Sequence, residues 1–308
     1  MKLKQKTIAG VVALYKTTPE FTRKIKSDKT RTQYAYQLSK LCALKGVAEL
    51  PVSELNVAKC QKIYWQLLES TTKDGTRFAN VTLQIATRAW NVMMKYDVLE
   101  KNPWQFVERT RPDPRNTVWN LSDFRTFLKT AFGEPKWRNI GLLVRIQVEL
   151  GQRINDIRLA QWGNFNLEEQ LYSREVIQKT RERIPGIPLS PELTQMLIDQ
   201  KAEYDFQEWV VPHPRSLKPY SEHNISSSFQ SIREAAGLPD TLQLRDIRRT
   251  VLTDLANCGA TDTEIMAYSG HKNRESLNPY VRISTEQARN AAAKRQFDPA
   301  SIMEDIDE

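Results

Sequence analysis

Apolar residues in the first third of the chain recur every three or four positions, the spacing of one face of an α-helix. The clearest runs are Tyr34, Leu38 and Leu41, then Ile63 and Leu67, then Val81, Ile85, Ala89 and Val92. Breaks follow at Gly46, at the turn Lys73-Asp74-Gly75 and at Asn102-Pro103. The pattern predicts about four helices packed as a small bundle over residues 1–107.

The opening segment resembles a secretion signal, because three lysines precede an apolar stretch that ends at Tyr15. However, Lys16 cuts the stretch short and no small-residue cleavage site follows. We therefore expect a short first helix instead of a signal peptide. Because the bundle starts so close to Met1, we expect no further domain before it.

Residues 108–118 are polar, contain two prolines and show no periodicity. Such a segment is typical of an extended linker between domains. We place a second domain at residues 119–283 and a tail at 284–308, whose last five residues carry four carboxylates.

Helical patterns return in the second domain. Ser122 is the expected N-cap of a helix through Phe124 and Leu128, and a longer apolar helix is expected over residues 137–150, ended by Gly151. Further helices are expected over residues 191–204, 221–236 and 244–257, and a capping box at 261–264 opens another.

Two short β-prone runs, residues 171–177 and 183–189, flank the polar turn 179–182 and predict a hairpin. The predicted fold class is therefore mainly α with a small β-hairpin sheet, in two domains.

Composition narrows the class of protein. With 40% hydrophobic and 27% charged residues and no apolar run near the roughly 20 residues that span a bilayer, the chain reads as soluble and cytoplasmic. Cys42, Cys60 and Cys258 are widely spaced, so they indicate reduced core residues and neither disulfides nor a zinc site.

Charge is distributed unevenly along the chain. Residues 1–117 carry 21 Lys and Arg against 10 Asp and Glu, whereas the remainder carries 24 against 27. An excess of this kind favours binding to a polyanion such as nucleic acid, although a merely solvated basic surface has the same composition. The candidate phosphate contacts are Lys24, Lys26, Lys29, Arg31, Arg77, Arg88 and Arg111.

A basic stretch on the helix expected over residues 244–257 places Arg245 and Arg248 on one face. Two guanidiniums at that spacing suit one phosphate, because each offers a planar fork of donors. Taken alone, the stretch is better explained by a solvated arginine face.

The order of five features decides between these interpretations. Arg153 follows the break at Gly151, Lys179 lies at the hairpin, Arg245 and Arg248 follow, and then come Gly270-His271 and Tyr280. This order and spacing resembles the tyrosine recombinases, or phage integrases. The resemblance covers residues 119–283 with specific motifs, and more loosely the basic helical domain, which resembles the core-binding domain of the family.

The resemblance implies roles for these residues. Arg153 and Arg248 would clamp the scissile phosphate, Lys179 would protonate the leaving 5′ oxygen, His271 would assist, and Tyr280 would attack. Asp156, one turn after Arg153, would buttress the site or cap the helix that follows. Cationic donors would stabilise the charge that develops in phosphoryl transfer, and neither ATP nor a metal ion is implied.

Two departures concern the nucleophile. Arg245 stands where the family has a histidine, and an arginine cannot act as a general base. A free phenol, with a pKa near 10, needs a base or nearby cations to attack. Pro279 directly precedes Tyr280, and we hypothesise that the segment around Tyr280 docks only on DNA.

The expected function is a site-specific DNA recombinase that works through a 3′-phosphotyrosine intermediate on double-stranded attachment sites. The resemblance further implies a homotetramer on two DNA sites, with possible accessory DNA-bending proteins and a tail that docks on a neighbouring protomer. The expected source is bacterial or phage. Two alternatives remain open, a catalytically reduced DNA-binding regulator of the same fold and a type IB topoisomerase-like enzyme.

Overall fold

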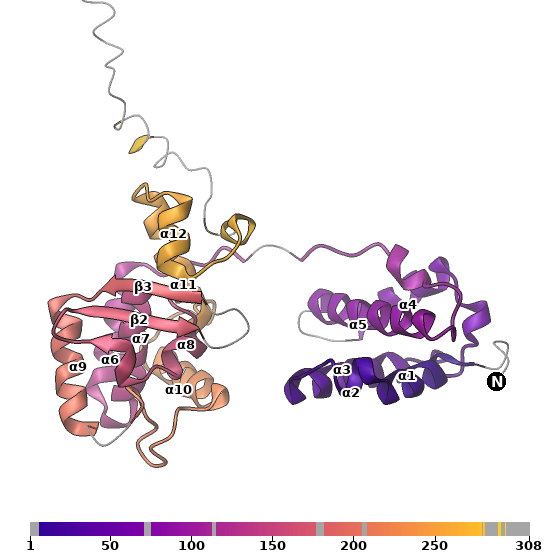
Figure 1. The fold of residues 1–308 in the computed structure, drawn as a ribbon, viewed down its shortest axis with the longest axis horizontal. Coiled ribbons are helices and arrows are strands. Elements are labelled where there is room, and N and C mark those ends of the chain that lie inside the picture. Colours follow the sequence, from indigo (N-terminus) through magenta and orange to yellow (C-terminus); the bar gives the residue numbers. More distant parts are fainter. Residues whose placement is uncertain are drawn as a thin grey trace, which may run out of the picture. The chain divides into compact units, whose positions relative to one another are not determined.

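The computed structural model describes residues 6–70, 75–112, 115–176, 182–204, 208–278, 280, 289–290 and 293. The chain separates into two compact units, Met1–Arg115 and Asn116–Glu308, which Figure 1 draws as two bodies. The division falls inside the segment expected to be a linker.

The N-terminal unit is a helical bundle. Its helices are α1 (Ile8–Thr17), α2 (Pro19–Thr22), α3 (Asp28–Cys42), α4 (Val57–Glu69) and α5 (Gly75–Lys95), with short 3-10 helices at Val52–Glu54 and Pro103–Phe106. Thr7, Ser27 and Asn56 cap α1, α3 and α4 by accepting the backbone N–H of the residue three positions on. The four expected helices are confirmed, and α2 is an additional single turn.

A continuous apolar core fills this bundle. Trp90 of α5 packs edge-to-face on Trp104, with ring centroids 5.7 Å apart. Residues after the bundle are held to it as well, because the Gln61 amide accepts from the Glu108 backbone N–H at 2.9 Å and donates to its carbonyl at 3.2 Å. The segment expected to be an extended linker therefore starts against α4, and not free of the bundle.

The second unit is mainly helical with one small sheet. Its helices are α6 (Leu121–Gly133), α7 (Arg138–Leu150), α8 (Ile154–Arg158), α9 (Pro191–Tyr204), α10 (Glu222–Ala235), α11 (Leu244–Asn257) and α12 (Asp262–Ser269), and short 3-10 helices lie at Pro135–Trp137, Trp162–Asn164 and Arg274–Leu277. The antiparallel sheet has the order β1-β2-β3, with β1 (Phe165–Asn166), β2 (Leu171–Val176) and β3 (Glu182–Pro188). The hairpin prediction is confirmed, and β1 is an unpredicted third strand.

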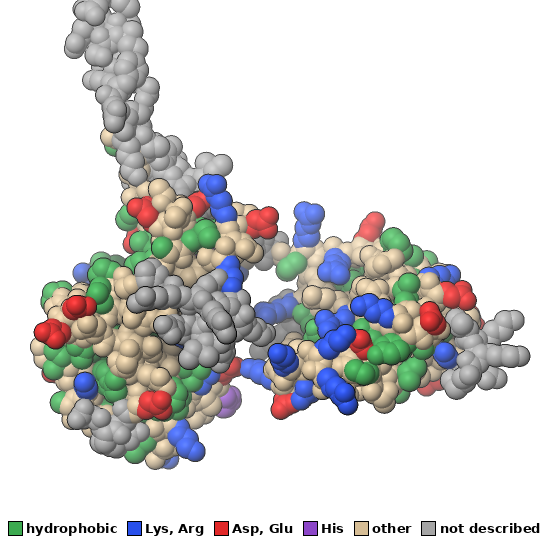
Figure 2. All heavy atoms as spheres, in the orientation of Figure 1, with side chains coloured by type: hydrophobic (Ala, Val, Ile, Leu, Met, Phe, Trp, Pro, Cys, Tyr) green, Lys and Arg blue, Asp and Glu red, His purple; other side chains and the backbone are tan. Residues whose placement is uncertain are grey.

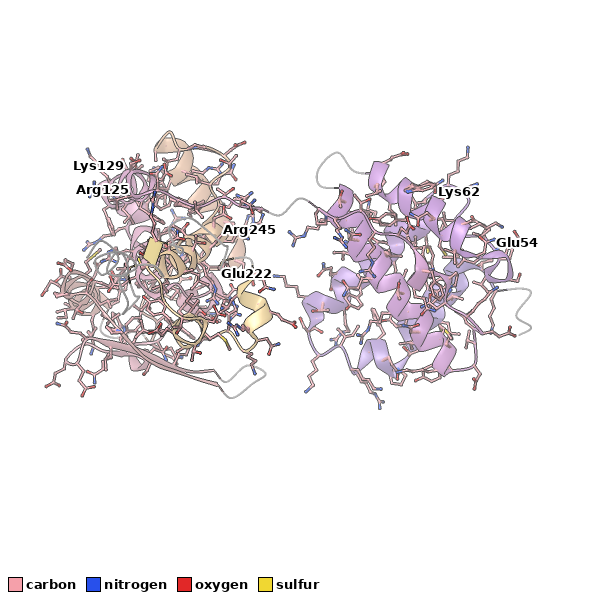
Figure 3. The ribbon with its side chains drawn as sticks, turned by 90° about the horizontal axis from the view of Figure 1, so that it is seen from above. Glu54, Lys62, Arg125, Lys129, Glu222 and Arg245 are labelled. Carbon is pink, nitrogen blue, oxygen red and sulfur yellow. The ribbon has the colours of Figure 1, made fainter. Side chains whose placement is uncertain are left out.

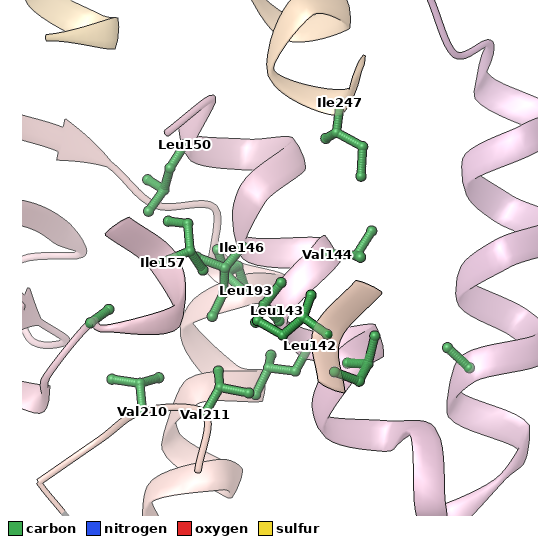
Figure 4. Close-up of a cluster of buried hydrophobic side chains, with 14 of the residues drawn as sticks. Leu142, Leu143, Val144, Ile146, Leu150, Ile157, Leu193, Val210, Val211 and Ile247 are labelled. Atoms are coloured by element: carbon green, nitrogen blue, oxygen red, sulfur yellow. The ribbon is translucent and has the colours of Figure 1, made fainter. Parts of the chain in front are cut away.

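Helix α7 runs through the centre of this unit, because α6, α9, α10 and α11 all pack against it. Its apolar residues face neighbours on most sides, as Figure 4 shows for Leu143 and Ile146 near Ile157 and Leu193. The sheet lies beside the helices, where β3 packs against α12 (Figure 1). The core thus fixes the C-terminal ends of α7 and α12, which both become important for the candidate site.

Two sequence expectations about single residues are wrong. Asn120, and not Ser122, caps α6, because its side chain accepts the Asp123 N–H at 2.8 Å while the Asp123 carboxylate accepts the Asn120 N–H. Cys258 is exposed at the end of α11, whereas Cys60 is buried and Cys42 half-buried. Burial raises the pKa of the Cys60 thiol to about 12.

No helix within the described ranges is both long and apolar enough to cross a membrane. The same ranges hold no group of three or more His, Cys, Asp and Glu side chains arranged to bind a metal ion.

Candidate active site

Arg248 is a buried arginine in the second turn of α11, with 7% of its surface exposed. Its Nη1 donates to the Gly151 carbonyl and its Nη2 to the Ser269 carbonyl, each at 3.0 Å. These carbonyls lie at the C-terminal ends of α7 and α12, where unpaired carbonyls carry partial negative charge. Two helix ends therefore hold one guanidinium in a fixed orientation.

The sequence makes both helix ends possible through glycine. Gly151 closes α7 with a φ of 59°, and Gly270 closes α12 with a φ of 67°. Other residues rarely adopt this left-handed conformation, which turns the chain sharply after the last helical carbonyl. The residues that follow the turns, Arg153 and His271, are thereby brought toward Arg248.

Arg153 is the N-cap residue of α8 and is exposed. Its charge lies close enough to lower the pKa of both Arg248 and His271. Burial is the larger cause for Arg248, whose pKa falls to about 10, so this side chain stays protonated at neutral pH. Arg153 and Arg248 therefore both place positive charge close to His271.

Asp156 interacts electrostatically with Arg248 and with the sheet. Its carboxylate forms an ion pair with Arg174 of β2, with 2.6 Å between Oδ1 and Nη1, which ties α8 to the sheet. The Asp156 charge also favours the charged form of Arg248. The Asp156 carboxylate therefore interacts with Arg174 of the sheet and with Arg248 of the candidate site.

His271 lies against Arg248, whose Nη2 is 3.3 Å from the ring Nδ1 and 3.2 Å from Nε2. The Ser269 hydroxyl is 2.6 Å from Nδ1. Burial, followed by the charges of Arg248 and Arg153, lowers the pKa of His271 to about 4. The imidazole is therefore neutral at physiological pH.

Tyr280 is half-buried, and its ring centroid lies 5.5 Å from that of His271. The Arg249 guanidinium lies 5.8 Å from the ring centroid of Tyr280. The Tyr280 ring packs on a small cluster that includes Leu252 and Ile265, and its N–H donates to the Leu277 carbonyl at 2.7 Å. Tyr280 is thus placed beside the imidazole and the guanidiniums.

The structure therefore brings Arg153, Arg248, His271 and Tyr280 together, four of the six predicted catalytic residues. Arg245 lies one turn before Arg248, and its side chain is exposed at the start of α11 (Figure 3). Lys179 lies outside the described residues, as do Pro279 and most of the tail.

Three residues near this cluster were missed in the sequence: Arg174, Arg249 and Ser269. Arg249 directly follows Arg248, and Ser269 precedes the Gly-His pair. Position next to a motif residue was therefore the only signal for either of them. Arg174 had no such signal, because only the pairing of β2 brings it to Asp156.

The basic residues predicted to contact DNA lie mostly on the surface of the N-terminal unit. Lys24, Lys26, Lys29, Arg77, Arg88 and Arg111 are exposed, and Figure 2 shows many Lys and Arg side chains spread over the visible face of this unit. Arg31 is half-buried instead, where it donates to the Ile25 carbonyl at 2.5 Å and pairs with Asp28. Its side chain therefore also closes the turn before α3.

Chemically, the cluster suits a tetrahedral oxyanion. Arg153 and Arg248 offer cationic donors, the neutral imidazole of His271 can donate or accept, and the Tyr280 hydroxyl can act as a nucleophile. The buried guanidinium is oriented before any substrate arrives, which is the arrangement that stabilises charge developing in a transition state.

Comparison with known proteins gives a family and a fold. Residues 121–287 match the phage integrase family. A Tn1549 transposon integrase in complex with a circular intermediate DNA is 15% identical, with a TM-score of 0.74 over 94% of this chain and 99% of that one. A lambda integrase dimer bound to a COC′ core site is 16% identical, with a TM-score of 0.72 over 91% and 100%.

A lambda integrase tetramer bound to a Holliday junction is also similar, at 16% identity and a TM-score of 0.71 over 96% of this chain and 80% of that one. At these identities the likeness is one of fold. None of the curated proteins compared matches the sequence.

Proposed function

The chain belongs to the phage integrase family, and on that basis we propose that this tyrosine recombinase cleaves and rejoins duplex DNA at specific sites through a 3′-phosphotyrosine intermediate. One observation carries the proposal: Tyr280 lies beside His271 and next to the buried, doubly held Arg248. A nucleophile, an imidazole and a fixed cation are then available at one phosphate.

The proposed reaction follows from these positions. Arg153 and Arg248 bind the scissile phosphate, and the Tyr280 oxygen attacks phosphorus. Lys179, which lies between β2 and β3 in the sequence, protonates the leaving 5′ oxygen, and Arg245 donates to the phosphate from the start of α11. The Tyr280–phosphate link retains the energy of the phosphodiester, so the reverse attack by a 5′ hydroxyl reseals a strand.

A suicide DNA substrate, nicked so that the leaving strand diffuses away, tests the nucleophile. We expect wild-type protein to form a covalent adduct that Tyr280→Phe abolishes, while Tyr36→Phe, which alters an exposed tyrosine of α3, keeps it. An adduct that survives Tyr280→Phe would refute the assignment. Wild-type protein that binds the substrate without forming an adduct would instead favour the alternative of a catalytically reduced DNA-binding regulator.

Strand exchange separates a recombinase from a topoisomerase-like enzyme. With two differently labelled duplex sites, we expect products that join one to the other. Relaxation of supercoiled DNA by a protein that forms the adduct but never joins two duplexes would favour the topoisomerase-like alternative.

The assembly is also part of the proposal. The lambda integrase tetramer on a Holliday junction supports a homotetramer that joins two DNA sites. In this arrangement the N-terminal unit binds core DNA, and residues 284–308 dock on a neighbouring protomer. Accessory DNA-bending proteins would assist if the sites must be brought together by looping. Sedimentation of the protein with two-site DNA should give a complex of four chains, and a complex of one chain per site would contradict it.

A further inference from the structure

Ser269 is a fully buried serine at the end of α12, and its hydroxyl has two partners. The Oγ atom lies 2.5 Å from the Ile265 carbonyl oxygen, one turn earlier, and 2.6 Å from Nδ1 of His271. The same residue supplies the backbone carbonyl that Arg248 binds. Ser269 thus contacts Arg248 and His271, two of the residues beside Tyr280 in the site.

The single proton of the Ser269 hydroxyl determines which ring nitrogen of His271 is protonated. A serine hydroxyl has one proton, and a carbonyl oxygen can only accept, so the bond to Ile265 uses that proton. The hydroxyl can then only accept from His271, which means that Nδ1 carries the ring proton. Nε2 then carries the lone pair, and Nη2 of Arg248 lies at a similar distance from both ring nitrogens, 3.2 Å from Nε2 and 3.3 Å from Nδ1.

The tautomer of His271 matters because it decides which group near Tyr280 can accept a proton. Among the described residues, the polar side chains that contact Tyr280 include Arg248 and Arg249 of α11 and His271 of the turn after α12. Arginine is a donor with no acceptor, as is Arg153 nearby. Within this set, only Nε2 of His271 can take a proton from the Tyr280 hydroxyl.

We propose that Ser269 is a positioning residue that holds His271 as the Nδ1–H tautomer, so that Nε2 accepts the Tyr280 proton during DNA cleavage. This inference rests on the proposed function for the role of Tyr280. The proton passes from the Tyr280 hydroxyl to Nε2, the Tyr280 oxygen bonds to phosphorus, and the 5′ oxygen leaves with a proton from Lys179. The opposite tautomer would present an N–H and could only donate to the phosphate.

A bound phosphate diester makes the acceptor stronger. The pKa of His271 is lowered to about 4 partly by the charges of Arg248 and Arg153. A negative phosphate between those guanidiniums offsets their effect and raises the pKa toward neutrality, where a general base works best. The phosphate also binds Arg248 N–H groups that otherwise lie against the imidazole.

The tautomer can be measured on the full chain without any reaction, because the chain contains three histidines. The ¹⁵N shifts of the imidazole nitrogens distinguish protonated from unprotonated atoms, and His271→Gln identifies the signals of His271. We expect Nδ1–H in the wild-type protein and a shift toward Nε2–H in Ser269→Ala. An Nε2–H tautomer in the wild-type protein, or an unchanged tautomer in Ser269→Ala, would overturn the proposal even if Tyr280 is the nucleophile.

Cleavage kinetics test the catalytic consequence. Ser269→Ala should slow covalent adduct formation about tenfold, the factor that a net hydrogen bond of about 1.4 kcal/mol represents, with little change in DNA affinity. Ser269→Thr keeps the hydroxyl and should retain most of the rate. Ser231→Ala is the matched control, because its hydroxyl also donates to a carbonyl one turn earlier, at 3.1 Å, in α10.

These outcomes distinguish a failure of the proposed recombinase function from a failure of the role proposed for Ser269. No adduct with any variant, together with the expected tautomers, would defeat the proposed function and leave the role of Ser269 in fixing the tautomer standing. Equal cleavage rates for Ser269→Ala and wild-type protein would defeat the inference while Tyr280 remains the nucleophile. If Ser269→Ala fails to fold, Ser269→Cys provides the comparison, because a thiol of similar size is a weaker hydrogen-bonding group.

Discussion

The Arg248 guanidinium is held by two backbone carbonyls, and it also contacts His271 through Nη2 and interacts with Tyr280. This residue therefore contributes to stability through its buried bonds and to chemistry through its remaining donors. Substitutions at position 248 can separate the two contributions, because a lysine retains the charge but not the planar fork.

We expect Arg248→Ala to reduce the free energy of unfolding by about 1–3 kcal/mol, because it leaves two buried carbonyls without donors. Adduct formation should fall by at least about a hundredfold. Arg248→Lys should lie between wild-type protein and Arg248→Ala in both measurements. Urea unfolding and the suicide-substrate assay measure the two effects. Wild-type cleavage by Arg248→Ala would contradict this placement of the phosphate.

His271 makes stability depend on pH. Its ordinary pKa is 6.5, whereas burial and the nearby arginines lower the pKa to about 4 in the folded chain. Between these values the unfolded chain binds a proton that the folded chain does not, so stability falls as pH falls from about 6.5 to 4. Above this window the contribution is fully present, and below it the loss is complete.

Because His271 is half-buried, the expected loss is on the order of 1 kcal/mol after allowance for solvent screening. The measurement is urea unfolding at several pH values, with wild-type protein compared with His271→Gln, which should show a shallower dependence over this window. His223→Gln, at an exposed position, is the control. Parallel curves for wild-type protein and His271→Gln would show that this histidine is not the cause.

At the scale of elements, the site is built where helices end. α7 and α12 both stop at a glycine with positive φ, and the residues on either side of those turns supply the carbonyls and side chains around Arg248. A substitution at Gly151 therefore tests the geometry of a helix end without removing any site side chain.

Gly151→Ala should lower stability by about 2–3 kcal/mol. A left-handed alanine costs about 1 kcal/mol, and its Cβ would lie 3.0 Å from Cγ1 of Val251, which adds about 1–2 kcal/mol of crowding. Gly237→Ala is the matched control, because Gly237 has a φ of +65° but no atom within 4 Å of such a Cβ. Thermal or urea unfolding measures the difference. Equal losses in the two variants would show that Val251 moves aside at no cost.

Local signals predicted some elements to the residue. The bounds of α9 and α11, Pro191–Tyr204 and Leu244–Asn257, are those expected. Proline at the first position is a start signal for α9, and Gly259 is a stop signal after α11. The N-cap of α6 was assigned wrongly to Ser122, since Asn120 and Ser122 are both good caps and only the reciprocal bond with Asp123 decides between them. β1 has two residues and no sequence pattern of its own.

The candidate site shows the same limit of local information. Arg153, Arg248, His271 and Tyr280 were identified because their order matches a known family. Ser269 and Arg249 could not be ranked above other neighbours of those motifs, because their importance depends on which groups α11 and the turn after α12 bring together. Burial at the end of α11 also differs from expectation, since Cys258, expected in the core, is exposed while Ala256 is buried.

At the scale of the whole molecule, the two units differ in charge, which predicts that DNA affinity and DNA cleavage depend on different residues. The first 117 residues carry an excess of positive charge, 21 against 10, and the remainder is close to balance, 24 against 27. If the N-terminal unit contributes most phosphate contacts, substitutions there should alter the salt dependence of DNA binding and leave the reaction of bound DNA unchanged.

The double variant Lys24→Gln with Lys26→Gln tests this division, because both side chains are exposed on the N-terminal unit. Each lost phosphate contact should reduce the slope of log affinity against log salt by about 1, so a decrease of about 1 to 2 is expected, equally for specific and nonspecific DNA. Affinity titrations at several salt concentrations measure it, and single-turnover cleavage at saturating protein should stay unchanged.

Lys136→Gln with Lys201→Gln is the matched control for loss of two positive charges. Lys136 precedes the N-terminus of α7, about 20 Å along that helix from Gly151, and an ion pair between Arg138 and Glu203 places the end of α9 beside the same helix start. These lysines therefore lie far from the site, and their loss should leave the salt slope as in wild-type protein. If the control variant changes the slope as much as the double variant, net charge and not the N-terminal surface governs DNA affinity.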